Sequence, residues 1–398
     1  MFTALGGVWG EGGWWSNWQG VGVSSTPLDV IKASLTTIGG VGGTAYLVIR
    51  YRERASAERA EAEHKLLNAV QQLGSESPQV RIAGVYALAD VADTYRGGYR
   101  QRVVNILCGY LRTQRGEWKT IVNEQDRPKQ SSEEKVYVSQ DGAVESTALE
   151  VLGRHLRKRH EKADTHGAVS RDVEDDQLWC DCTIDLHDAV ITESLNFTDV
   201  TLASDASFQG ATFNTFAIFQ GASFDAHVTF RGATFNYDAH FERATFKDDA
   251  HFERATFKDD TSFWGATFNY DAYFERATFK DDTYFSGATF NDDAHFERAT
   301  FKDDTSFSGA AFNDDAHFER ATFKDDTSFS GATFNANTSF RGATFNRAAP
   351  PTGIPRKLVD HETGLPKGAR WARFKDKSEV IEEGSPEPDK PSDAAGSS

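Results

Sequence analysis

Phenylalanine returns at a fixed spacing through the C-terminal half of this 398-residue chain. From Phe208 to Phe345 a phenylalanine stands at alternate steps of five and six residues, and the same alternation begins upstream at Leu186. The unit is doubled, because ERATFKDDTYFSGATFNDDAHF (275–296) is followed by the near-copy ERATFKDDTSFSGAAFNDDAHF (297–318). A fixed period of this length is typical of a solenoid, in which each repeat packs on its neighbours.

Each of these phenylalanines follows a small residue, usually Ala or Thr, two positions earlier. Alternate residues of a strand face the same side, so both positions of each step point inward. Within 297–307 we expect inward side chains at Ala299, Phe301, Thr305 and Phe307. Eleven residues cannot close a coil around a filled interior, whereas twice that number can, with four short faces. The sequence therefore predicts an α + β solenoid in which residues 179–349 form a right-handed quadrilateral β-helix of 22-residue coils.

The N-terminal region carries a different pattern. Residues 1–26 are rich in Trp and Gly, which fits either an interfacial aromatic anchor or a disordered terminus. Residues 33–49 contain no charged residue, and Arg50, Arg52 and Arg54 follow directly. We expect a single-pass transmembrane helix over 27–50, and the positive-inside rule would place the C-terminal region in the cytoplasm. The expected membrane-spanning segment includes Ala33, Gly39, Gly43 and Ile49, and the Gly39/Gly43 spacing would suit a homodimer of such helices.

The remaining segments are assigned by periodicity and composition. A charged juxtamembrane helix is expected over 51–75, and a small helical domain resembling HEAT units over 76–160, with a long loop at 116–140. A polar linker is expected at 161–178, a C-terminal cap at 350–376 with RWARF as a last strand, and a disordered tail at 377–398.

The A-x-F step resembles the motif of the pentapeptide-repeat family, which centres on Leu or Phe with a small residue two positions before it. This chain departs from the strict form by a sixth residue at every second step. Residues 69–93, followed by VVNILCGYLR (103–112), are similar to the helical segment of membrane-anchored bacterial pentapeptide-repeat proteins. The resemblance implies a β-helix behind a membrane helix and a helical block, and it implies no agreed activity and no catalytic residues.

Charge indicates where a partner would bind. Residues 180–350 hold 28 acidic against 13 basic residues, and the whole chain has a net charge of −17, which argues against direct nucleic-acid binding. Columns of Glu and Arg, and of Lys and Asp, would compensate one another. The other half-coil lacks a basic neighbour, so the predicted interaction surface consists of Asp271, Asp292, Asp293, Asp314, Asp315, His295 and His317.

These features predict a non-enzymatic, membrane-tethered scaffold that presents a rigid, acidic β-helix to a cytoplasmic protein partner. The alternative is a DNA mimic that regulates a type II topoisomerase, a role suggested by the family resemblance and by the negative charge. Cation binding by the His and Asp columns is a lesser alternative, and we expect no cofactor and no resident metal.

Overall fold

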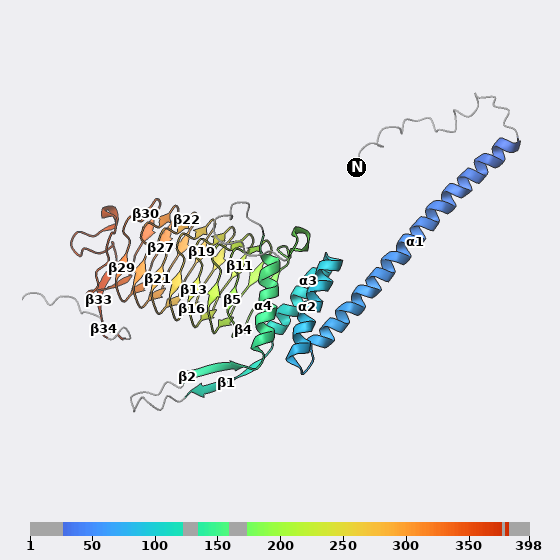
Figure 1. Cartoon of the computed structure of the whole chain (residues 1–398). Coiled ribbons are helices and arrows are strands. Elements are labelled where there is room, and N and C mark those ends of the chain that lie inside the picture. The colour runs from blue at the N-terminus through green and yellow to red at the C-terminus, as the bar shows by residue number, and fades with distance from the viewer. Residues whose placement is uncertain (1–26, 122–133, 159–172, 376–378, 382–398) are drawn as a thin grey trace, which may run out of the picture. The chain divides into compact units, whose positions relative to one another are not determined.

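The computed structural model describes residues 27–121, 134–158, 173–375 and 379–381 (Figure 1). The predicted N-terminal segment 1–26, most of the predicted linker and the end of the predicted tail lie outside the described residues. The chain divides into two units, residues 1–64 and residues 65–398, and each is considered by itself.

The first unit contains most of helix α1, which runs from Pro27 to Leu73 without a break. All of the predicted membrane-spanning and basic positions, from Ala33 to Arg54, lie in this helix. Arg54 donates from Nε to Oε1 of Glu58 at 3.0 Å, an exposed pair one helical turn apart.

The structure does not support the transmembrane part of the fold prediction. No helix among the described residues has an apolar stretch long enough to cross a bilayer. The uncharged run 33–49 is diluted by four glycines and three threonines, and Lys32 and Arg50 close it at its two ends. A helix needs about 20 predominantly apolar residues to span hydrocarbon, and this run provides fewer.

The second unit begins with a helical block. Helix α2 (Pro78–Tyr95) packs on α3 (Gly98–Arg112) and α4 (Gly142–Leu156), and Leu66 from the last turns of α1 belongs to the same buried cluster as Leu88 and Leu107. Gly84 permits the close approach of α2 to α1, because a Cβ there would come within 2.6 Å of the Leu73 backbone nitrogen.

Residues 116–121 and 134–139, which the sequence placed in a long loop, are strands in the structure. Strands β1 (Gly116–Ile121) and β2 (Glu134–Ser139) form an antiparallel hairpin, with Trp118 opposite Tyr137. The two rings meet edge to face at 5.2 Å, and such cross-strand aromatic pairs stabilise a hairpin. The alternation of Trp, Tyr and Val with polar residues was too short to be distinguished from an aperiodic loop.

The solenoid has four parallel sheets, which we name faces A to D in chain order. Face A holds β3 (Ile184–Asp185), β7 (Ala206–Ser207), β11 (Val228–Thr229), β15 (Ala250–His251), β19 (Ala272–Tyr273), β23 (Ala294–His295), β27 (Ala316–His317) and β31 (Thr338–Ser339). Face B holds β4 (Val190–Ile191), β8 (Thr212–Phe213), β12 (Thr234–Phe235), β16 (Thr256–Phe257), β20 (Thr278–Phe279), β24 (Thr300–Phe301), β28 (Thr322–Phe323) and β32 (Thr344–Asn346).

The other two faces are built in the same way. Face C holds β5 (Leu195–Asn196), β9 (Ala217–Ile218), β13 (Ala239–His240), β17 (Thr261–Ser262), β21 (Thr283–Tyr284), β25 (Thr305–Ser306) and β29 (Thr327–Ser328). Face D holds β6 (Thr201–Leu202), β10 (Ser223–Phe224), β14 (Thr245–Phe246), β18 (Thr267–Phe268), β22 (Thr289–Phe290), β26 (Ala311–Phe312) and β30 (Thr333–Phe334).

Each strand pairs with the equivalent strand of the next coil, as the register of Ala250 with Ala272 shows. The predicted β-helix of four faces is therefore confirmed. Ala299, Phe301, Thr305 and Phe307 are all buried, as the strand alternation predicted. The Thr305 hydroxyl is satisfied inside the wall, because it donates to the Asp303 carbonyl at 3.2 Å.

The interior is a set of phenylalanine columns. Along one column the rings lie nearly parallel, as for Phe257 and Phe279 with centroids 4.8 Å apart. Across the interior they meet edge to face, as for Phe252 and Phe263 at 5.4 Å and 88°. Both geometries are favourable for aromatic quadrupoles, and each fully buried ring contributes about 1.5–3 kcal/mol from burial.

The corners between faces are of two kinds, five or six residues long when counted from one inward phenylalanine to the next. The five-residue corners, A to B and C to D, place one residue in the left-handed region, for example Arg298 (φ 59°) and Gly309 (φ 69°). The six-residue corners, B to C and D to A, contain no residue of positive φ within the solenoid. Glycine tolerates the left-handed conformation, whereas arginine adopts it at a cost that the stacked coil must offset.

The helical block covers the first coil. Arg115 pairs with the fully buried Glu145, whose Oε1 accepts from the Thr192 backbone nitrogen of the solenoid at 2.6 Å. Arg157 donates to the carbonyls of Asn196 and Thr198, and Trp179 is buried against His155 with ring centroids 3.9 Å apart. These contacts satisfy polar backbone groups that the first strands would otherwise expose.

The C-terminal end is covered differently. Strand β33 (Arg370–Lys375) pairs with β32 and extends face B, and β34 (Glu379–Ile381) pairs antiparallel with β33. The predicted RWARF strand is present. Strand β34 falls inside the predicted disordered tail, where the short apolar run VI was hidden among charged and small residues.

Candidate interaction surface

Face A presents a repeated row of polar side chains to solvent. In the coil of β23 the row is Asp293, His295 and Glu297, whose alternation with the buried Ala294 and Phe296 puts all three side chains outside. The neighbouring coils repeat it as Asp271–Tyr273–Glu275 and Asp315–His317–Glu319. Carboxylates therefore stand on both sides of a central aromatic column.

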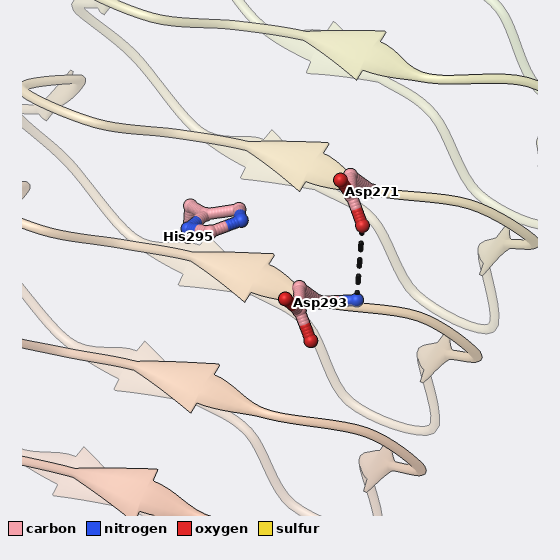
Figure 2. A group of neighbouring side chains, drawn as sticks. All are labelled: Asp271, Asp293 and His295. Carbon is pink, nitrogen blue, oxygen red and sulfur yellow. Dashed lines mark hydrogen bonds between the residues drawn. The ribbon is translucent and has the colours of Figure 1, made fainter.

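The structure brings the predicted surface residues together. Asp271, Asp293 and Asp315 stack at the D–A corner, where the Asp293 backbone nitrogen donates to Asp271 Oδ1 at 3.2 Å (Figure 2). The Asp315 nitrogen donates to Asp293 Oδ1 in the same way, also at 3.2 Å. Asp292 and Asp314 occupy the preceding corner position, one coil apart.

The central column is aromatic and ordered by stacking. His295 lies between Tyr273 and His317, and both ring centroids are 4.9 Å from its own. His295 Nδ1 is 3.4 Å from Glu297 Oε1, and this carboxylate raises the pKa of the imidazole although partial burial opposes the shift. The reciprocal hydrogen bond lowers the pKa of Glu297 against the opposing effect of its burial.

The Glu column was missed as part of this surface. Sequence reasoning grouped Glu297 with the Arg and Lys columns of the same half-coil, whereas strand alternation places it on face A beside His295. The signal was available, because Asp293, His295 and Glu297 are spaced two residues apart.

Electrostatic conditions vary along the Glu column. Burial would raise the pKa of Glu253, but hydrogen bonds from His251 and Arg231 lower it to about 2. Glu275 has Tyr273 beside it instead of a histidine, and burial together with Glu297 and Glu253 raises its pKa. One carboxylate oxygen, Oε2, is buried without a hydrogen-bond partner in the described structure at each of Glu253, Glu275, Glu297 and Glu319.

The two six-residue corners differ in the residue that precedes their aspartates. From residue 258 onward the B–C corner has lysine there, as at Lys280 and Lys302. From residue 269 onward the D–A corner has asparagine, and these side chains hydrogen-bond along the rod, with Asn313 Nδ2 donating to Asn291 Oδ1 at 2.9 Å. At the D–A corner, partial burial and the carboxylates of Asp271, Asp293 and Asp314 raise the pKa of Asp292.

Comparison with known proteins agrees with this architecture. Residues 186–234, 226–267, 263–311 and 307–350 each match the family model described as pentapeptide repeats (9 copies). No curated protein and no solved structure matches the chain. The fold and the repeat define a β-solenoid built from pentapeptide repeats. The match covers residues 186–350, and it identifies this part of the chain as a pentapeptide-repeat solenoid.

Proposed function

We propose that the solenoid is a rigid, non-enzymatic scaffold that binds a basic surface of a protein partner through face A and the D–A corner. One observation carries the proposal: carboxylates flank the aromatic column on both sides in successive coils, and no basic residue stands at the D–A corner from Asn269 to Asn337. A partner with lysine or arginine at the spacing of the coils, about 4.8 Å, would match this charge pattern.

Rigidity supports the same role. Figure 1 shows the stacked strands of successive coils. Parallel pairing in every coil and the buried aromatic interior fix these strands, so the outward carboxylates are held in place before a partner binds. A preorganised surface avoids part of the entropy cost of ordering side chains on binding.

The test is a crosslinking pull-down from the native cell with the full chain as bait. A variant with Asp292, Asp293, Asp314 and Asp315 changed to Asn removes four charges from the D–A corner. A matched variant with Asp281, Asp282, Asp303 and Asp304 changed to Asn removes four charges from the B–C corner. We expect a partner with the wild type and the B–C variant and its loss with the D–A variant.

Two results would count against the scaffold. One is the absence of any reproducible partner, and the other is equal recovery with both variants. Recovery of a type II topoisomerase, with inhibition of its supercoiling activity by the full chain, would favour the DNA-mimic alternative.

Attachment to a membrane through residues 27–50, with the C-terminal region in the cytoplasm, stays a prediction. If it holds, the full chain sediments with membranes after a high-salt wash and a chain lacking residues 27–50 does not. Equal behaviour of the two chains would exclude this tether.

A further inference from the structure

Two groups of side chains on face A have the composition of a metal site. Ligand atoms of Asp271, Asp293 and His295 all lie within 4.8 Å of one another, and the same holds for Asp293, Asp315 and His317. Figure 2 shows the first group, with a ring nitrogen of His295 on the side of the two aspartates. Asp293 belongs to both groups.

We propose that these two groups bind a divalent transition-metal ion of the Zn²⁺ type, with Asp293 as the ligand that both share. One imidazole nitrogen and two carboxylates form a mixed N/O donor set with open positions for water or a partner's side chain. The imidazole distinguishes such a site from an all-oxygen site, which would suit Mg²⁺ or Ca²⁺. The proposed metal site uses residues of the proposed interaction surface, but metal binding by the chain alone requires no protein partner.

The histidine is held in the orientation that a ligand needs. His295 Nδ1 faces Glu297 Oε1 at 3.4 Å, on the opposite flank of the row from the aspartates. His317 Nδ1 faces Glu319 Oε1 in the same way at 3.6 Å. Metal-binding histidines commonly give their second ring nitrogen to a carboxylate, which fixes the tautomer and leaves the other nitrogen for the metal.

The aspartates are also positioned before an ion arrives. Asp271 and Asp293 each accept a backbone N–H through Oδ1 from the next coil. Asp271 Oδ2 also accepts from the Tyr273 hydroxyl at 2.8 Å. Asp293 Oδ2 has no hydrogen bond within the described residues, so this oxygen is available as the shared ligand. Stacked aspartates one coil apart repel, and a bound cation would offset that repulsion.

The Asp flank suits a cation better than the Glu flank does. Glu275, Glu297 and His295 also form a compact group, but each Glu of that corner is followed directly by an arginine. At the D–A corner the neighbours are asparagine and further aspartate. A divalent ion at the Asp flank therefore meets no competing positive charge from its own corner.

The experiment uses the full chain after removal of metal with EDTA and dialysis. Zn²⁺ is titrated by calorimetry, and Co²⁺ is added separately as a spectroscopic probe of a nitrogen-containing site. We expect saturable binding of one or two ions, visible Co²⁺ absorption, and no comparable heat with Ca²⁺ or Mg²⁺. Asp293→Asn should weaken Zn²⁺ binding by at least about tenfold and remove the Co²⁺ bands.

Asp304→Asn is the matched control, because it removes the same charge from the equivalent position of the B–C corner, where no histidine lies in the row. Its Zn²⁺ affinity should stay within about twofold of wild type. Circular dichroism establishes that both variants keep the fold. Absence of wild-type binding, equal weakening in both variants, or full binding by the His295→Ala/His317→Ala variant would each overturn the proposal.

Discussion

The five-residue and six-residue corners of the same coil obey different rules. A five-residue corner turns through a left-handed residue, so its sequence is restricted to glycine or to a residue that accepts strain, such as Arg298. A six-residue corner has one more residue and makes the turn without positive φ. Its residues thus do not have to be glycine or to adopt a left-handed conformation. Surface chemistry can vary there, and both the lysine-bearing and the asparagine-bearing aspartate corners are of this kind.

The largest expected effect comes from the interior that both kinds of corner share. Phe296→Ala removes a buried ring that stacks on Phe274 and Phe318. We expect the free energy of unfolding to fall by about 3–5 kcal/mol, measured by urea denaturation followed by circular dichroism. A loss below about 1 kcal/mol would mean that the corners, and not the phenylalanine columns, hold the coils together.

The interior was also what the sequence predicted best. The spacing of Phe301 and Phe307 and the alternation around them determined the coil length, the number of faces and the inward residues. Nothing in the sequence indicated that Arg298 would be left-handed, because stacking in register imposes that conformation against arginine's own preference. The surface was predicted in part: grouping by half-coil found Asp293 and His295 but separated Glu297, which the strand places beside them.

Glu253 and Glu275 stack in one column at the A–B corner, and low pH should change their contributions to stability in opposite directions. Glu253 has a folded pKa of about 2, below its ordinary value of 4.5, so its interactions stabilise the fold above about pH 4.5 and are lost as pH falls towards 2. Glu253→Gln should lower stability at pH 7 by about 1–2 kcal/mol, allowing for solvent screening, and flatten the acid dependence. Thermal unfolding between pH 2 and 7 measures both effects.

Glu275→Gln is the control with the opposite sign. Its pKa is raised, so ionisation of Glu275 costs stability as the pH rises through that value. We expect the variant to be at least as stable as wild type at pH 7. Equal destabilisation by both changes would show that the column acts only through packing.

The cost of the left-handed conformation at a five-residue corner is tested at Gly309. Its φ is 69° and a Cβ would find open space, with the nearest atom 4.0 Å away, so Gly309→Ala isolates the cost of the left-handed conformation. We expect a loss of about 1 kcal/mol. Asp314→Ala, in a six-residue corner, should change stability by less than about 0.5 kcal/mol. If both variants lose similar stability in urea unfolding, the two kinds of corner do not differ in their backbone requirement.

The smallest effect distinguishes the two six-residue corners. Asn313→Ala removes the bonds to Asn291 and Asn335, both 2.9 Å long and exposed to solvent. A loss of about 0.5–1 kcal/mol is expected, against almost none for Lys302→Ala. If the lysine variant loses as much stability, the asparagine ladder does not stabilise its corner beyond what a lysine provides.

The near-identity of successive repeat units has a consequence for how such a chain changes over time. Every pairing and stacking contact of one coil recurs in the next, so an in-frame duplication of one unit adds a coil without creating a new kind of contact. The described structure covers the two ends of the rod with the helical block and with residues 350–375, which contain β33. Duplication of the DNA that encodes one unit would thus change the number of coils. It would also change the number of equivalent positions at which a partner or an ion could bind along the rod.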